Sequence, residues 1–141
     1  VAGDPWMKTN VTVDAQTRLK WMKQICENTF NGKVIVDDRE VKREGATYTV
    51  DTLKELSKQY VGDELVLIVG EDVPPTMDRW KDIQKVRELC EIFVVPREIV
   101  KVSSTEIREK ISAGQDLNSL IPQEIEREIY QKALYNVTTP R

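Results

Sequence analysis

The sequence predicts an α/β protein built on a doubly wound parallel sheet. Apolar runs of strand length alternate with segments whose apolar residues recur at helical spacing. The connections between the runs are long enough to hold helices, as parallel strands require. The two clearest runs, at residues 64–69 and 91–95, are apolar almost throughout, which is typical of strands covered on both faces.

Length and composition describe one globular domain that spans residues 1–141. Hydrophobic side chains make up 40% of the sequence and charged ones 32%, with a net charge of −3. A chain of this length buries about two-thirds of its unfolded surface, so it needs no disulfide or metal for stability. The slight negative charge argues against a general polyanion-binding surface, so we expect no nucleic-acid partner.

The absence of histidine excludes the most common metal sites and the histidine-dependent nucleophilic triads and pairs. We find neither an apolar run of membrane-spanning length nor the layout of a signal peptide, so no membrane partner is expected. Cys26 and Cys90 lack metal-site spacing and lie in apolar periodic segments, which predicts two buried, unreactive thiols. These observations together indicate a reducing, cytoplasmic location.

The first third of the chain reads as a loop, a helix and a short strand. Residues 1–10 have turn chemistry, and Asp14 is a suitable N-cap for a helix that ends at Asn31. Residues 33–37 predict a short strand, because three β-branched residues stand in a row. The charged stretch at residues 38–45 is expected to be a solvated loop or an edge strand.

The middle of the chain predicts a helix, a strand and two further helical stretches. Thr49 is a good N-cap for a helix that reaches about Tyr60. The apolar run at residues 64–69 is a strand that ends at Gly70. Helical stretches are then expected around residues 77–81 and over residues 82–89.

The remaining elements are expected to be strands at residues 91–95 and 99–102 and helices at residues 103–112 and 122–135. Pro96 ends the first of these strands. Ser103 and Glu106 have the S-x-x-E spacing of a capping box, and Gly114 is suited to the end of that helix. Pro122 fits the first turn of the last helix.

Three segments would lie where ligands bind in open parallel sheets, beyond the carboxyl ends of the strands. Residues 70–72 and 96–97 follow strands, and residues 103–105 open a helix whose free amides attract anions. Arg108, one turn further on, could add a charge-assisted contact. Residues 103–108 can also be interpreted as an ordinary capping box with a surface arginine.

Other candidates also have a structural alternative. Trp80 could stack on an aromatic ligand, or belong to the core. Asp72 could bind a ribose hydroxyl, or serve in a turn. Tyr48 and Thr49 could offer backbone amides to a ligand, or only begin a helix.

Residues 45–53 read Gly-Ala-Thr-Tyr-Thr-Val-Asp-Thr-Leu, and residues 102–108 read Val-Ser-Ser-Thr-Glu-Ile-Arg. These segments resemble the G-x-x-Y-T-x-D-T-L and I-S-S-T-x-I-R motifs of bacterial nicotinate-nucleotide adenylyltransferases. Further matches follow in the family's order: Pro5 with Lys8, Arg18 with Met22, residues 68–72 with Trp80, residues 93–97, and residues 121–122 with residues 134–135.

The resemblance implies a Rossmann-like nucleotidyltransferase fold that transfers the adenylyl group of ATP to nicotinate mononucleotide. The products would be deamido-NAD and pyrophosphate, and Mg²⁺ would accompany ATP, with no metal site built from the protein alone. The residues implied for the mononucleotide are Tyr48, Thr49, Asp72, Trp80, Lys8 and Arg18. The residues implied for ATP are Arg97, Ser103, Ser104, Thr105 and Arg108.

The chain also departs from the family pattern. The family opens with a strand, a glycine-rich turn and a histidine-x-glycine-histidine motif, and none of these is present. We therefore assign no catalytic residue and expect an N-terminally incomplete domain, inactive alone, whose sheet has a central gap or an exposed edge. The stretch between Arg97 and Ser103 is short, and Glu71 stands where the family has a small or amide residue.

Two alternatives to this function remain open at this point. One is a related adenylyltransferase that acts on phosphopantetheine. The other is a non-catalytic nucleotide-binding or oligomerisation module derived from the same fold. Under the first interpretation the partners are ATP and nicotinate mononucleotide, and self-association stays open.

Overall fold

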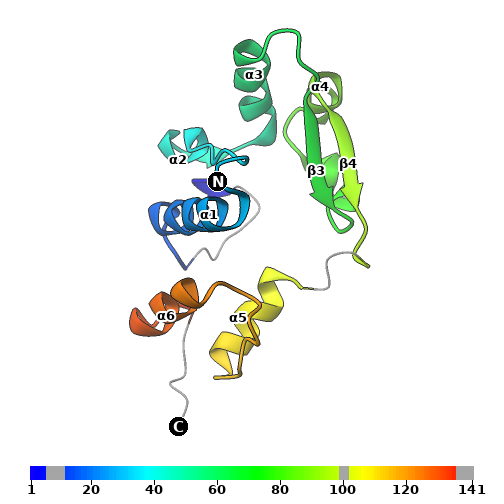
Figure 1. Cartoon of the computed structure of the whole chain (residues 1–141). Coiled ribbons are helices and arrows are strands. Elements are labelled where there is room, and N and C mark those ends of the chain that lie inside the picture. Colours follow the sequence, from blue (N-terminus) through cyan, green and yellow to red (C-terminus); the bar gives the residue numbers. More distant parts are fainter. Residues whose placement is uncertain (6–11, 99–101, 136–141) are drawn as a thin grey trace.

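The computed structural model of the protein describes residues 1–5, 12–98 and 102–135, and within these ranges the fold is mixed α/β (Figure 1). Strand β1 (Asp4–Pro5) pairs in parallel with β2 (Ala46–Thr47), and β3 (Val66–Gly70) pairs in parallel with β4 (Glu91–Val95). The two pairs are separate two-stranded sheets. The predicted α/β fold class with parallel strands is confirmed, and the absence of the family's first strand stays a prediction.

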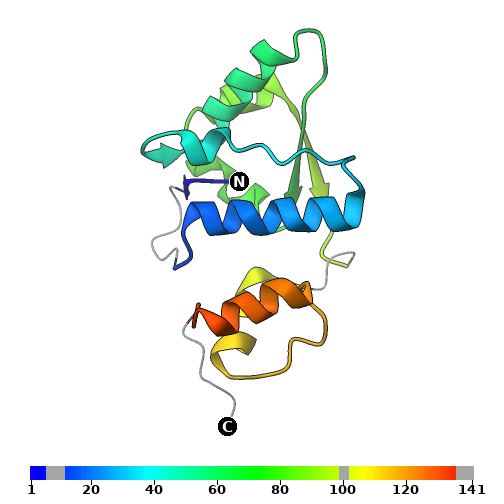
Figure 2. The same cartoon turned by 60° about the vertical axis from the view of Figure 1, so that its left-hand side comes forward.

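Helical segments alternate with the strands. They are α1 (Ala15–Phe30), α2 (Arg39–Lys42), α3 (Thr49–Gln59), the 3-10 helix η1 (Pro74–Arg79), α4 (Ile83–Leu89), α5 (Ser104–Ser112) and α6 (Gln123–Gln131). Figures 1 and 2 show α3 and α4 beside the β3–β4 sheet, with α1 crossing the middle of the molecule. Helices α5 and α6 lie on the other side of α1.

Helix α1 begins and ends as the sequence predicts. The Asp14 carboxylate accepts hydrogen bonds from the backbone N–H of Thr17 at 2.9 Å and from its hydroxyl at 2.7 Å. These bonds hold the pKa of Asp14 below its ordinary value. Asn31 ends the helix in the left-handed conformation, with φ of 47°, which asparagine tolerates better than most residues.

Two apolar clusters form the core. The larger one joins α1, α5 and α6 and contains Val13, Trp21, Ile111, Leu117, Ile125 and Ile129. The smaller one joins α3 and α4 through Val50, Leu53 and Val86, with Leu67 of β3 packed against it. The molecule is therefore held together chiefly by helix packing, and the sheet is covered from one side.

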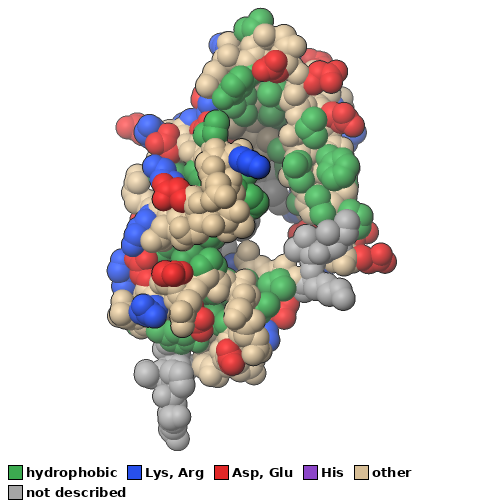
Figure 3. All heavy atoms as spheres, in the orientation of Figure 1, with side chains coloured by type: hydrophobic (Ala, Val, Ile, Leu, Met, Phe, Trp, Pro, Cys, Tyr) green, Lys and Arg blue, Asp and Glu red, His purple; other side chains and the backbone are tan. Residues whose placement is uncertain are grey.

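The prediction that the β3 and β4 strands are covered on both faces is wrong. Val66, Ile68 and Phe93 are 53%, 67% and 55% exposed. Ile68 and Phe93 are paired in the sheet register, and alternate side chains of a strand point to opposite faces. Because Leu67 points toward the helices, Ile68 points away from them. Figure 3 shows hydrophobic side chains gathered over this sheet.

Three local predictions also need correction. Residues 33–37 form no strand, because Ile35 is 81% exposed and no described strand pairs with it. Part of the stretch at residues 38–45 forms α2, where Lys42 pairs with Asp38 at 2.9 Å. The N-cap of α3 is Tyr48, not Thr49, because the Tyr48 carbonyl accepts from the amide of Asp51 at 3.1 Å.

Later elements are shorter than predicted. Helix α6 ends at Gln131 rather than near Tyr135, since Ala133 and Tyr135 have positive φ angles of 47° and 60°. The expected strand at residues 99–102 falls mostly on residues outside the described ranges, and Val102 itself is not in a strand. Cys26 is buried as predicted, and Cys90 is half-buried, where burial raises the pKa of its thiol.

Candidate functional site

A cavity of about 520 Å³ opens at the carboxyl ends of β3 and β4, opposite the first turn of α5. Three separate segments, each predicted from its place after a strand or before a helix, contribute to its lining. Its polar and charged lining residues are Glu71, Asp72, Arg97, Ser103, Ser104 and Glu106. The structure therefore brings Asp72, Arg97, Ser103 and Ser104 together, as the sequence predicted.

The first turn of α5 presents its N-terminus at this cavity. Ser103 is the N-cap, and its hydroxyl oxygen accepts from the backbone N–H of Glu106 at 3.1 Å. A serine hydroxyl that accepts one hydrogen bond can also donate its proton, and the first amides of a helix have no partner within the helix. The capping role is confirmed, and the same geometry attracts an anion to this end of the helix.

The ends of β3 and β4 are tied to each other beyond the last paired residues. The Glu71 carboxylate accepts a hydrogen bond from the backbone N–H of Arg97 at 3.1 Å. Next to it, the Asp72 carboxylate folds back so that Oδ1 lies 2.7 Å from where a Cβ on Gly70 would stand. A Cβ at position 70 would therefore push the Asp72 carboxylate out of this position.

Thr105 and Arg108 do not line this cavity. The Arg108 guanidinium donates to the Thr105 hydroxyl at 3.1 Å, and Arg108 lines a second, mainly apolar cavity of about 530 Å³ between α1, α5 and α6. Arg97 and Arg108 thus line different cavities, and Ser104 is common to both.

Arg18 is held by backbone carbonyl groups. Its guanidinium nitrogens donate to the oxygens of Val13 at 3.1 Å, Ala2 at 2.7 Å and Gly3 at 2.9 Å. The side chain therefore fastens the first residues of the chain to the start of α1. Lys8, its companion in the predicted phosphate-binding set, lies outside the described residues.

Tyr48, Thr49 and Trp80 lie away from the first cavity, at the start of α3 and ahead of α4. Lys81 joins these two places. Its ammonium lies 4.5 Å from the centroid of the Tyr48 ring and 2.9 Å from the Asp51 carboxylate. Sequence reasoning missed Lys81, because no local pattern encodes its contact with the Tyr48 ring.

Trp80 has a buried indole nitrogen with no hydrogen-bond partner among the described residues. A buried donor without a partner is uncommon in a folded protein. The structure places Asp72 with the residues implied for ATP. It places Trp80 and Tyr48 in a separate group, linked through Lys81.

Across the described ranges, the structure contains no group of three or more Cys, Asp or Glu side chains arranged to hold a metal ion. None of the helices described is long and apolar enough to cross a membrane.

Comparison with known proteins defines the class. A family model described as cytidylyltransferase-like matches residues 2–113. A relative from Borrelia garinii subsp. bavariensis, assigned as a nicotinate-nucleotide adenylyltransferase, is 31% identical over 140 residues, which cover 87% of this chain and 70% of the relative. The fold and these matches are those of a nucleotidyltransferase.

A crystal structure from Vibrio parahaemolyticus, assigned to the same enzyme, matches with a TM-score of 0.74 at 17% identity. The match covers 89% of this chain and 74% of that one, and it supports the fold. The chain belongs to the nicotinate-nucleotide adenylyltransferase family of cytidylyltransferase-like proteins. Its class is therefore that of the adenylyl-transferring enzymes of NAD biosynthesis.

Proposed function

We propose that this protein transfers the adenylyl group of ATP to nicotinate mononucleotide, in the cytoplasm. The observation that supports the proposal most is the cavity that gathers Asp72, Arg97, Ser103 and Ser104 at the carboxyl ends of two parallel strands. Such an edge, faced by a helix N-terminus, is where open α/β sheets bind nucleotides. The product is deamido-NAD, and pyrophosphate is released.

In this reaction an oxygen of the mononucleotide phosphate attacks the α-phosphorus of ATP. One P–O bond forms there while the bond to the β-phosphate breaks, and pyrophosphate leaves with the electron pair. The chemistry requires two anions to be aligned and their charge to be offset, so no protein nucleophile is needed. The α5 amides, the serine hydroxyls and Arg108 offer that stabilisation to ATP phosphates.

Within this proposal Arg97 contacts the adenosine side of ATP, and Arg108 reaches the phosphates past Ser104. Trp80 stacks on the electron-poor pyridine ring, and Asp72, Tyr48 and Thr49 hold the rest of the mononucleotide. Because Arg18 is bound to three carbonyl oxygens, its role is to fix the N-terminal segment.

Mg²⁺ belongs to this reaction as the companion of ATP, where it offsets the charge on the phosphates. The residues present fit that use, because Mg²⁺ is usually held by one or two carboxylates together with substrate phosphates and water. The carboxylates that line the cavity are Glu71, Asp72 and Glu106.

The test is incubation of the protein with ATP, Mg²⁺ and nicotinate mononucleotide. Deamido-NAD and pyrophosphate should form in equal amounts, and failure to form either would refute the proposal. Phosphopantetheine in place of the mononucleotide should give no product. Binding of both substrates in calorimetry without turnover would instead identify a non-catalytic module.

A further inference from the structure

We propose that Glu71 is a positioning residue that holds Arg97 at the cavity and so strengthens ATP binding. The inference rests on the proposed function, because Arg97 is taken to contact ATP. Glu71 follows Gly70, the last residue of β3, and Arg97 stands two residues after Val95, the last residue of β4.

The hydrogen bond between these residues extends the sheet past its last pair. Gly70 and Val95 are the final register partners of β3 and β4. Beyond them, the backbone N–H of Arg97 donates to the Glu71 carboxylate at 3.1 Å and joins the segments that follow the two strands. Within the described part of the chain, Arg97 has no other hydrogen bond or ion pair. The direction in which Arg97 leaves the strand therefore depends on Glu71.

The carboxylate also has an opposing effect. Among the described residues that line the cavity, Glu71, Asp72 and Glu106 are negative and only Arg97 is positive. A nucleotide phosphate entering the cavity meets this excess of negative charge. Glu71 thus favours ATP binding through its hydrogen bond and disfavours it through its charge, so a simple deletion would mix the two effects.

A pair of substitutions separates them. Glu71→Gln and Glu71→Ala both remove the charge, but the glutamine amide oxygen can still accept from the Arg97 N–H. The difference between these variants is therefore a measure of the hydrogen bond. Glu98→Gln and Glu98→Ala form the matched control, since exposed Glu98 lies beside Arg97 and has no hydrogen bond or ion pair among the described residues.

The experiment measures ATP and mononucleotide affinity by calorimetry and the exchange of the Arg97 amide by NMR. We expect Glu71→Ala to bind ATP about two- to tenfold more weakly than Glu71→Gln, the range expected for one hydrogen bond. Its Arg97 amide should exchange faster, and mononucleotide affinity should be the same in both variants. The two Glu98 variants should not differ from each other.

Equal ATP affinity in the two Glu71 variants, or equal exchange of their Arg97 amides, would overturn the inference. Thermal melting checks that every variant is folded. If the unaltered protein failed to bind ATP, the proposed function would fail, and this inference would fail with it. The Arg97 exchange would still show whether the contact exists, so the two failures can be told apart.

Discussion

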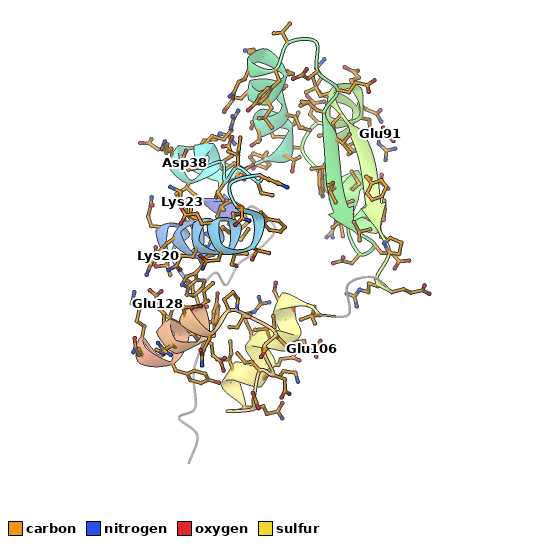
Figure 4. All side chains as sticks on the ribbon, viewed as in Figure 1. Lys20, Lys23, Asp38, Glu91, Glu106 and Glu128 are labelled. Atoms are coloured by element: carbon orange, nitrogen blue, oxygen red, sulfur yellow. The ribbon has the colours of Figure 1, made fainter. Side chains whose placement is uncertain are left out.

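The indole N–H of Trp21 donates to the Glu128 carboxylate at 3.0 Å, and this bond joins α1 to α6. Lys20 and Lys132 reach the same carboxylate at 2.9 and 2.7 Å. Figure 4 shows Lys20 and Glu128 facing each other from the two helices. The hydrogen bonds from Lys132, Lys20 and Trp21 lower the pKa of Glu128 from 4.5 to about 2.

A first prediction concerns acid stability. A carboxyl group whose pKa is lowered by folding stabilises the protein above its unfolded pKa and loses that effect as the pH falls through the folded value. The free energy of unfolding should therefore be lower in Glu128→Gln than in the unaltered protein, and this difference should be largest at pH 7. It should shrink between about pH 5 and pH 2, the interval set by the two pKa values.

Urea unfolding of both proteins at several pH values gives this difference directly. Glu124→Gln on the same helix is the control, because Glu124 is exposed and makes no ion pair within the described residues. A difference between Glu128→Gln and the unaltered protein that stays constant from pH 7 to pH 2 would contradict the assignment.

A second prediction contrasts a core isoleucine with an exposed one. Ile111 is completely buried between α1, α5 and α6, so Ile111→Ala should lower the free energy of unfolding by about 2–5 kcal/mol. Ile35 is 81% exposed, and Ile35→Ala should change it by no more than about 0.5 kcal/mol. Denaturant titration measures the free energy of unfolding of each variant. A large decrease in Ile35→Ala would support the strand predicted there from the sequence.

A third prediction tests the stacking platform. Trp80→Ala should weaken mononucleotide binding by about 1–3 kcal/mol, the scale of a lost aromatic stack, and leave ATP binding unchanged. Trp80→Phe keeps an aromatic face and should retain most of the affinity. Calorimetry with each ligand measures both effects. An unaltered mononucleotide affinity in Trp80→Ala would remove this residue from the site.

A fourth prediction contrasts Arg108, implied for ATP by the resemblance, with Arg18, implied for the mononucleotide. Arg108→Ala should weaken ATP binding by about 1.5–3 kcal/mol, as for a charge-assisted hydrogen bond, with little change in melting temperature. Arg18→Ala should lower the melting temperature and speed amide exchange near Ala2 and Gly3, because three carbonyls lose their donor. If Arg18→Ala weakened only ATP binding in an equally stable protein, a direct phosphate contact would be indicated.

A fifth prediction concerns the end of β3. In Gly70→Ala the added Cβ would stand 2.7 Å from Oδ1 of Asp72, so the carboxylate must move. Because Asp72 is proposed to hold the mononucleotide, affinity for that ligand should fall, and Asp72→Ala should lower it in the same direction. Titration calorimetry compares the two. Loss in Asp72→Ala with none in Gly70→Ala would show that the folded-back position of the carboxylate is unimportant.

Local sequence signals predicted the elements that depend on local chemistry. The Asp14 and Ser103 caps were found because a side-chain oxygen must meet amides two or three residues ahead. The strand ends at Gly70 and Val95 were found because long apolar runs stop there. Since parallel strands end at one edge, their ends and the start of α5 could be expected to meet, and they do.

Features that depend on contacts with residues far away in the sequence could not be predicted from local sequence patterns. The run at residues 33–37 has strand composition, but a strand also requires a neighbour to pair with. Arg18 looks like any surface arginine until the carbonyls of Ala2 and Gly3 are placed beside it. Lys81 and Glu71 matter through contacts with residues 33 and 26 positions away, which no local pattern encodes.

The open side of the β3–β4 sheet has a practical consequence for the protein in solution. The exposed side chains of Ile68 and Phe93, which are register partners, form a hydrophobic patch that favours self-association. Salts such as sulfate strengthen contacts between patches of this kind. The apparent mass from light scattering should therefore rise with protein concentration and with added sulfate. The Ile68→Lys variant should show no such rise.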